Sequence, residues 1–276
     1  MIDRMVSTVI DPERCTGCGL CVRVCPAGTI SLQGGKAVVS GDRSLSCGHC
    51  AAVCPADAIT IQALDPGASM YATFDADHRW LAPGEADTAQ LVRLMASRRS
   101  CRNFQVKPVE RAALEDLVRI GVTAPSGTNS QTWTFTILPT RGAVTSLGDQ
   151  VALFFRRINK AAEKRWLRTA LRLIGKPELH DYYRDYHQSV AEALAERASG
   201  GADRLFHGAT AAIVVGSGPG GSTAKEDALL ATQNILLAAH GMGLGTCLIG
   251  FAAIPLVRDL RIKRSIGIPD REKIHA

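Results

Sequence analysis

The placement of the cysteines constrains the fold of this chain more than any other feature. Seven of the nine cysteines lie within the first 54 of 276 residues, and only Cys101 and Cys247 lie outside that segment. Residues 15–26 read Cys-Thr-Gly-Cys-Gly-Leu-Cys-Val-Arg-Val-Cys-Pro, a C-x2-C-x2-C-x3-C-P run. In such a run three thiolates on one tight loop bind a [4Fe–4S] cluster, and the fourth cysteine faces a second cluster. The spacing therefore predicts an iron–sulfur unit, distinct from the rest of the chain.

The cysteine block occurs twice, at a shift of 29 residues. The shift superposes three cysteines and one proline: Cys18 on Cys47, Cys21 on Cys50, Cys25 on Cys54 and Pro26 on Pro55. It brings Cys15 onto Ser44. Such a repeat predicts two half-domains, each with a short strand, a cluster loop and a helical turn, related by a local two-fold axis. A structural zinc site is the competing interpretation, but four zinc ligands would not explain the repeat with its prolines.

This block resembles a two-cluster bacterial ferredoxin. The crossed ligation of that family implies one complete site, formed by Cys15, Cys18, Cys21 and Cys54. It implies a second site formed by Cys25, Cys47 and Cys50, with Ser44 as the candidate for the fourth position. Three states of this second site stay open: a [4Fe–4S] cluster with serine or water on one iron, a [3Fe–4S] cluster, or no cluster.

The distribution of apolar residues predicts a cytoplasmic protein without a membrane span. Charged residues such as Asp3, Arg4 and Asp11 interrupt the first residues, so a secretory signal with an apolar core is not predicted. The most apolar later stretch, residues 228–257, is interrupted by polar side chains and glycines and falls short of the roughly 20 apolar residues that a span needs. In a reducing compartment, clustered cysteines are metal or cluster ligands more often than disulfides.

Beyond the cysteine block the sequence predicts an α+β protein: a ferredoxin-like domain over residues 1–64, a linker over 65–88, and a mixed-sheet α/β domain over 89–276. Helices are expected from Thr88, after Pro108 up to Gly121, and up to Gly241, the last with a capping box of Thr223 and Glu226. Strands are expected over 132–138, 211–215 and 246–249, and the first should bury Trp133, Phe135 and Ile137 on one side.

Three segments of the second domain carry candidate binding groups. One helix is expected to begin at Thr88. If the chain is extended after that helix, three side chains fall on one side and form a phosphate site: Arg98, Ser100 and Arg102. Arginines at this place could instead cap the helix. Residues 124–131 form a loop of small residues with free amides, and residues 241–251 are rich in glycine. Residues 216–221 also match G-x-G-x-x-G, but Pro219 and the missing βαβ context argue against a dinucleotide site.

In this order and spacing, the three segments resemble the FMN-dependent nitroreductase family over about residues 89–276. The resemblance implies a homodimer with FMN at the subunit interface, and loops from both chains. It implies that Pro125, Ser126, Gly127 and Asn129 contact the isoalloxazine and ribityl groups, and that Ile249 and Gly250 lie beside the flavin ring. The phosphate candidates are Arg98, Arg99, Ser100 and Arg102.

Two positions depart from the family pattern. Thr132 stands where the family usually has proline. The sequence also reaches Ala276 directly after residues 268–275, where family members usually continue to a basic residue at the FMN phosphate. This second departure leads to the expectation of a C-terminal truncation and of weaker FMN retention.

The net charge of +6 is concentrated in one segment. Residues 151–176 contain eight Lys and Arg against one acidic residue, so the rest of the chain is nearly neutral. Val151, Phe155, Trp166 and Leu173 predict one amphipathic helix with a basic face. That face could be simply solvated, or could attract an acidic protein, an anionic substrate or a membrane surface. No nucleic-acid-binding module accompanies it.

The function predicted from these features is an FMN-dependent oxidoreductase of cytoplasmic location. Iron–sulfur clusters would pass electrons to FMN, which would reduce a small electrophilic acceptor such as a nitro compound, quinone or enone. Ferredoxin or NAD(P)H could be the donor. The alternatives are an NAD(P)H-dependent flavin or nitro reductase, and a redox-sensing module without turnover. No catalytic side chain is required, because the flavin supplies the organic chemistry.

Overall fold

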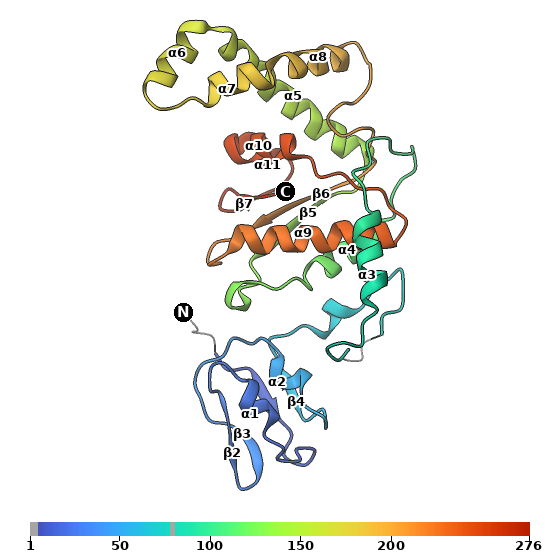
Figure 1. Cartoon of the computed structure of the whole chain (residues 1–276), viewed down its shortest axis with the longest axis vertical. Helices are drawn as coiled ribbons and strands as arrows, with labels where there is room; N and C mark the ends of the chain where they lie inside the picture. Colours follow the sequence, from blue (N-terminus) through green and yellow to red (C-terminus); the bar gives the residue numbers. More distant parts are fainter. Residues whose placement is uncertain (1–4, 78–80) are drawn as a thin grey trace.

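The computed structural model describes residues 5–77 and 81–276. Residues 1–4 of the predicted ferredoxin-like domain, and residues 78–80 of the predicted linker, lie outside the described residues. Figure 1 shows the cysteine-rich unit at one end of the long axis and the larger unit above it. Among the described residues, no helix is both long enough and apolar enough to cross a membrane.

The cysteine-rich unit consists of two similar halves. Its elements are β1 (Thr8–Ile10), α1 (Leu20–Val24), β2 (Ile30–Gln33), β3 (Lys36–Val39), α2 (His49–Ala52) and β4 (Ile59–Ile61). Strand β1 pairs antiparallel with β4, and β2 pairs antiparallel with β3. Each helix begins after a glycine in the left-handed region, Gly19 at φ 71° and Gly48 at φ 75°. The strand, loop and helix order in each half confirms the predicted repeat.

In the described part of the segment after this unit, the only helix before α3 (Thr88–Ser97) is the short 3-10 helix η1 (Pro66–Ser69). The side chain of Asp87 accepts a hydrogen bond from the amide of Gln90 and caps α3. Helix α3 thus starts where the sequence predicts, but none of its residues is buried.

The larger unit is built on a three-stranded antiparallel sheet with the order β5 (Trp133–Leu138), β6 (Ala212–Ser217) and β7 (Lys273–Ile274). Trp133 lies opposite Ser217, and Gly216 opposite Ile274. Helices α4 (Arg111–Gly121) and α9 (Ala224–Gly241) cover one face. Helices α5 (Arg141–Glu163), α10 (Gly250–Arg258) and α11 (Leu260–Ser265) cover the other. The predicted strands 132–138 and 211–215 are therefore confirmed to within two residues, and β7 is an element that the sequence did not predict.

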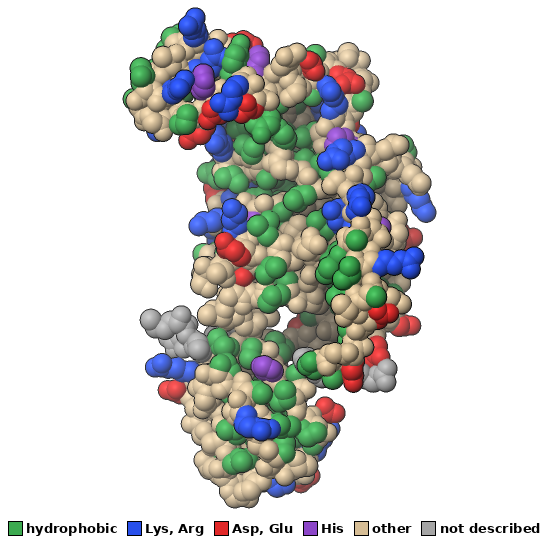
Figure 2. Space-filling model, viewed as in Figure 1, with side chains coloured by type: hydrophobic (Ala, Val, Ile, Leu, Met, Phe, Trp, Pro, Cys, Tyr) green, Lys and Arg blue, Asp and Glu red, His purple; other side chains and the backbone are tan. Residues whose placement is uncertain are grey.

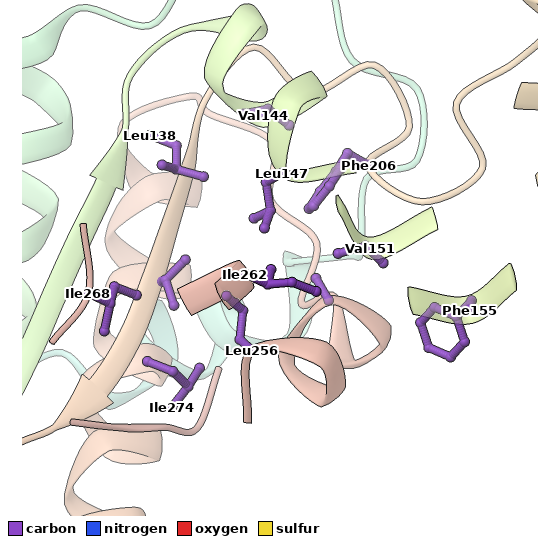
Figure 3. Packing of buried hydrophobic residues seen from close by; sticks show 12 residues of the cluster. Leu138, Val144, Leu147, Val151, Phe155, Phe206, Leu256, Ile262, Ile268 and Ile274 are labelled. Atoms are coloured by element: carbon purple, nitrogen blue, oxygen red, sulfur yellow. The ribbon is translucent and has the colours of Figure 1, made fainter. Parts of the chain in front are cut away.

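The two faces of β5 and β6 carry separate hydrophobic clusters. Trp133 and Phe135 pack toward α4 and α9, whereas Leu138 belongs to the cluster on the opposite face. Figure 3 shows Leu256 and Ile262 directed at this second cluster, between the strands and α5. Burying a side chain such as Leu256 contributes about 1.5–3 kcal/mol, so these clusters hold the helices on the sheet. Ile137 is half-buried and joins neither cluster.

The prediction of one helix over residues 151–176 is wrong. Helix α5 begins already at Arg141 and ends at Glu163, and a separate helix α6 (Arg165–Leu173) follows an extended Lys164 with ψ 97°. Val151 and Phe155 face the core, but Trp166 is 68% and Leu173 82% exposed. The predicted apolar stripe breaks because the core beneath α5 ends near Ala162, and α6 packs on α7 (Glu178–Asp185) instead. Helix α8 (His187–Ala198) completes this layer.

The basic residues of α6 lie at the end of the molecule opposite the cysteine-rich unit. Figure 1 places α6 at the top, and Figure 2 shows Lys and Arg side chains gathered there. Arg168 is not free, because its guanidinium lies 3.5 Å from the ring centroid of Tyr183. An acidic carrier attracted to α6 would approach an end of the chain that is remote from its clustered cysteines.

Two further local predictions are wrong. Residues 246–249 do not form a strand, and their only bridge within the described chain is a parallel one between Ser100 and Thr246. Three of the five residues before Thr246 are glycines, which weaken a strand, and α10 already begins at Gly250. Helix α9 also lacks the predicted capping box, because the hydroxyl of Thr223 donates to Asp227 at 2.9 Å instead of accepting from the helix.

Candidate functional site: two cysteine cavities and three loop segments

One cavity of the cysteine-rich unit is lined by Cys15, Cys18, Cys21 and Cys54. Cys15 and Cys18 come from the loop before α1, Cys21 lies in the first turn of α1, and Cys54 comes from the other half of the repeat. The tight loop depends on Gly17, where an added Cβ would lie 2.0 Å from the carbonyl oxygen of Gly35. The predicted complete ligand set therefore meets around one space.

A second cavity is lined by Cys25, Cys47, Cys50 and Ser44, together with residues such as Ile61. Ser44 is 7% exposed, which matches the 8% exposure of its repeat equivalent Cys15. The hydroxyl of Ser44 accepts a hydrogen bond from the amide of Ser46 at 2.9 Å. The structure thus places Ser44 in the wall of the same cavity as Cys25, Cys47 and Cys50.

Main-chain amides donate to the cysteine sulfurs in the same way in both halves. The amide of Thr29 donates to Sγ of Cys25 at 3.3 Å, and the amide of Ala58 donates to Sγ of Cys54 at 3.3 Å. The amide of Ala37 donates to Sγ of Cys15 at 3.4 Å. Hydrogen bonds to sulfur stabilise thiolates and tune the potential of a bound cluster. The donor set and its amides therefore fit iron–sulfur clusters.

Hydrogen bonds and burial move the thiol pKa values in opposite directions. The amide of Ala37 lowers the pKa of Cys15. Burial alone would raise the pKa of Cys25, but hydrogen bonds from the hydroxyl and the amide of Thr29 outweigh it and lower the pKa. Burial raises the pKa values of Cys21 and Cys50. A positively charged cluster iron would provide the compensation that these two buried thiolates need.

The first candidate flavin segment leaves α3 in an extended conformation at Arg98, with φ −61° and ψ 134°. Ser100 then pairs with Thr246, and the amide of Cys101 donates to the carbonyl of Thr246 at 2.8 Å. Arg99 points back, and its guanidinium donates to the carbonyls of Ala96 and Arg98 at the end of α3. The helix-capping alternative thus describes Arg99, whereas Arg102 lies exposed.

The second segment, residues 124–131, is held by a carboxylate that the sequence did not point out. Asp227, 3% exposed in the first turn of α9, accepts from the amide of Gly127 at 3.0 Å and from the hydroxyl of Ser130 at 3.3 Å. Ser126 accepts from the amide of Gln131 at 3.0 Å. An acidic residue in a first helical turn was the available signal, but only the fold shows its partners.

Asn129 of this segment contacts the cysteine-rich unit. Its side-chain amide donates to the carbonyl of Leu45 at 3.1 Å and to that of Ser46 at 3.0 Å. Both amide hydrogens are therefore engaged, and the side-chain oxygen is the polar atom left for another group. Pro125, also a candidate flavin contact, is exposed next to it.

The third segment, residues 241–251, passes close to the first. An added Cβ on Gly245 would lie 3.1 Å from the sulfur of Cys101, whereas one on Gly250 would meet no atom within 4 Å. The hydroxyl of Thr246 is buried and has no hydrogen-bond partner among the described residues. An orphaned hydroxyl and an open glycine beside Ile249 fit a site that a polar, planar group could occupy.

The candidate flavin contacts fall into two groups at opposite ends of α9. Ser100 and Thr246 lie near its C-terminal end, and Gly127 lies against its first turn. Figure 1 shows α3 at one end of α9 and the loop after α4 at the other. Helix α9 has 18 residues and a length of about 27 Å at 1.5 Å per residue. One chain alone does not bring all the predicted contacts together.

Comparison with known proteins connects both units to established families. Residues 8–31 match the 4Fe-4S binding domain family. A stretch of 32 residues is 53% identical to Ferredoxin-2 of Desulfomicrobium norvegicum. That alignment covers 12% of this chain and 54% of the ferredoxin, so the chain spans about half the length of this curated relative.

Solved structures resemble the larger unit at low identity. An FMN-bound nitroreductase from Bacteroides fragilis is 23% identical, with 67% of this chain and 84% of that chain covered and a TM-score of 0.48. An FMN-bound nitroreductase from Desulfitobacterium hafniense is 21% identical, with 67% and 84% covered and a TM-score of 0.47. Residues 95–276, which are most of the chain, match the Nitroreductase family itself. The chain therefore belongs to the nitroreductase family and carries a 4Fe–4S ferredoxin-type segment at its N-terminus.

Proposed function

We propose that this chain is an FMN-dependent oxidoreductase that receives electrons through iron–sulfur clusters and reduces a small electrophilic acceptor, such as a nitro compound, a quinone or an enone. The observation that carries the proposal is that hydrogen bonds from Asn129 join the nitroreductase-family unit to the unit that contains both cysteine cavities. Because these hydrogen bonds connect the two units in addition to the covalent linker, they fix the position of one unit relative to the other.

The residues present fit both groups. Cys15, Cys18, Cys21 and Cys54 would hold one [4Fe–4S] cluster, and Cys25, Cys47 and Cys50 would hold a second cluster beside Ser44. Arg98, Ser100 and Arg102 would hold the FMN phosphate, because guanidinium groups match phosphate oxygens in charge and geometry. When bound, FMN collects electrons singly and delivers them in pairs, and the clusters supply them one at a time.

The protein's own residues would position the flavin. The loop of Gly127 and Ser130 is fixed to α9 by Asp227, so its amides keep one orientation without reorganisation. The orphaned hydroxyl of Thr246 is a donor for a polar edge of the flavin. Gly250 leaves the first turn of α10 open, so the planar ring could approach the backbone there.

The separation of the candidate contacts along α9 supports a homodimer with FMN between the subunits. A second copy related by a two-fold axis would bring its residues 125–129 to the isoalloxazine and ribityl groups of the FMN whose phosphate the first copy holds. The exposed faces of α3 and α9 carry the apolar side chains Leu91, Val92, Met95, Leu229 and Leu230, each at least 39% exposed. Exposed apolar side chains in such number are expected to be covered in an assembly.

Anaerobic reduction of the purified protein tests the proposal. Reduced low-potential ferredoxin should bleach the flavin absorbance, and Cys21→Ser should abolish this bleaching while leaving bound FMN in place. Cys101→Ser, a cysteine outside both cavities, is the matched control and should bleach as the unmodified protein does. Bleaching by NAD(P)H that is equally fast in Cys21→Ser would favour the NAD(P)H-dependent reductase, and no bleaching by either donor would exclude turnover by this route.

A further inference from the structure

The loop around Asn129 is rigidly attached to the nitroreductase-family unit. The carboxylate of Asp227 binds Gly127 and Ser130, and it also accepts from the hydroxyl of Thr223 at 2.9 Å. Gly127 allows this packing, because an added Cβ would lie 2.1 Å from the Thr223 hydroxyl. The position of Asn129 is therefore determined by α9 and not by the cysteine-rich unit.

The backbone at this contact is held in a costly conformation. Six non-glycine residues of the described chain have positive φ, and four of them are Ser46, Thr128, Asn129 and Gln131. The left-handed region is unfavourable for a non-glycine residue, and a β-branched residue such as Thr128 is seldom found there. Strained backbone of this kind persists where surrounding contacts hold it, and it clusters at functional sites.

Asn129 reaches one of the two cysteine cavities specifically. It donates to the carbonyls of Leu45 and Ser46, which lie between Ser44 and Cys47 in the wall of the second cavity. The amide of Ser46 in turn donates to the hydroxyl of Ser44. Hydrogen bonds and short backbone segments therefore connect Asp227 on α9, through loop 124–131, to the serine at the position equivalent to Cys15.

We propose that Asn129 is a positioning residue that docks the Ser44 site against loop 124–131. The Ser44 site is then the inner iron–sulfur site, which faces the flavin, and the site of Cys15, Cys18, Cys21 and Cys54 is the outer one. The inference rests on the proposed function, because the order matters only if electrons pass through both sites. Two electrons from an external low-potential one-electron carrier, with two protons from solvent, balance the two-electron reduction of the acceptor.

The lone serine suits the inner position. A site with three cysteines and one serine has one sulfur ligand fewer than a four-cysteine site, and ligand identity is among the factors that tune the potential of a cluster. The amide of Ser46 donates to the hydroxyl of Ser44 and restricts its rotation. The carbonyl of Ser46 in turn accepts from Asn129. Asn129 therefore controls the loop geometry of the divergent site alone.

Hydrogen exchange of the intact protein measures the docking without any turnover. Asn129→Gly removes the side chain but tolerates positive φ, and Asn129→Asp keeps the shape without the two donors. Both should accelerate exchange in a peptide covering residues 44–49 by roughly thirtyfold, since the two lost hydrogen bonds together correspond to about 2 kcal/mol and tenfold is about 1.4 kcal/mol. A peptide covering residues 14–20 should exchange as before.

Asn234→Ala is the matched control. Its side-chain amide donates to the hydroxyl of Thr123 at 3.1 Å within the nitroreductase-family unit, so its loss should leave residues 44–49 unchanged. Unchanged exchange at residues 44–49 in both Asn129 variants would overturn the docking. Equal acceleration in residues 14–20 would show general loosening and would overturn the assignment to the Ser44 site.

A redox titration followed by electron paramagnetic resonance tests the order of the sites. Asn129→Gly should shift the midpoint potential of the Ser44 site and leave that of the four-cysteine site in place. A shift confined to the four-cysteine site would overturn the inner and outer assignment. Failure of every donor to reduce flavin in the unmodified protein would refute the proposed function, while the exchange result would still report on the docking.

Discussion

The main-chain amide and the hydroxyl of Thr73 both donate to one carboxylate oxygen of Asp116, at 2.8 and 2.7 Å. Asp116 is fully buried on α4 and also accepts from the amide of Ala72 and from Arg119. The segment that follows the cysteine-rich unit is thereby tied to the nitroreductase-family unit 43 residues later in the chain. This anchor and the contact of Asn129 limit the freedom of the two units.

Replacing Asp116 by Asn should destabilise the larger unit by about 2–3 kcal/mol. The amide nitrogen of the new side chain cannot accept hydrogen bonds, so buried donors of Ala72 and Thr73 lose their partner. Urea unfolding checks the stability, and limited proteolysis within residues 65–88 checks the anchor. Glu115→Gln, which removes an exposed ion pair with Arg111 on the same helix, should cost less than about 1 kcal/mol. Equal effects of the two variants would contradict the anchoring role.

The Asp116 anchor should also show a defined pH dependence. Burial alone would raise the pKa of Asp116, but hydrogen bonds from Ala72 and Thr73 outweigh it and lower the pKa below 3.8. A carboxyl group with a lowered folded-state pKa stabilises fully above its unfolded-state pKa and loses that contribution as the pH falls through the folded value. The difference in unfolding free energy between unmodified protein and Asp116→Asn should thus stay constant from about pH 7 to 5 and shrink below about 4. If this difference in unfolding free energy already shrinks between pH 7 and 5, a group other than Asp116 causes the pH dependence.

Ser44→Cys should complete the ligand set of the second cavity. The hydroxyl is already buried at the position equivalent to Cys15, so a thiolate there needs no rearrangement. We expect the electron paramagnetic resonance signal and the midpoint potential of the Ser44 site to change, because the candidate fourth ligand changes from oxygen to sulfur. Ser40→Cys places an exposed thiol in the same unit and should change neither quantity. An identical signal and midpoint potential in Ser44→Cys and in the unmodified protein would contradict a ligand position at residue 44.

Gly250→Ala separates a requirement of the flavin from a requirement of the fold. The new Cβ would meet no protein atom within 4 Å, so the apo-protein should unfold at the same or slightly higher urea concentration. If the flavin ring lies over this residue, overpacking should weaken FMN binding by about tenfold. Fluorescence titration of apo-protein with FMN measures the affinity. Unchanged affinity would place the ring elsewhere.

Arg102→Gln should weaken FMN binding by about 10- to 100-fold, which corresponds to one lost hydrogen bond to a charged group. The loss should diminish when riboflavin, which lacks the phosphate, replaces FMN in the titration. Arg93→Gln removes an exposed positive charge from α3 before the extended segment and should leave both affinities unchanged. A similar loss for FMN and riboflavin would argue against a phosphate contact at Arg102.

The sequence predicted the elements whose signal is local. The period-2 pattern of β5 depends only on neighbouring residues, and its alternation matches Phe135 on one cluster and Leu138 on the other. The repeat of the cysteine block likewise follows from spacing alone. The break at Lys164 had no such signal, because the residues around it are good helix formers and the core beneath α5 simply ends.

The cysteine spacing, by itself, determined that this chain carries an iron–sulfur unit with one divergent position, Ser44, since ligand spacing on a short loop is a local property. Only the tertiary structure decided that Asp227 fixes the loop of Gly127, and that this loop presents Asn129 to Ser46. These partners are separated by 83 or more residues, and hydrogen bonds over such distances leave no periodicity in the sequence. They arise when the sheet, α9 and the cysteine-rich unit have packed.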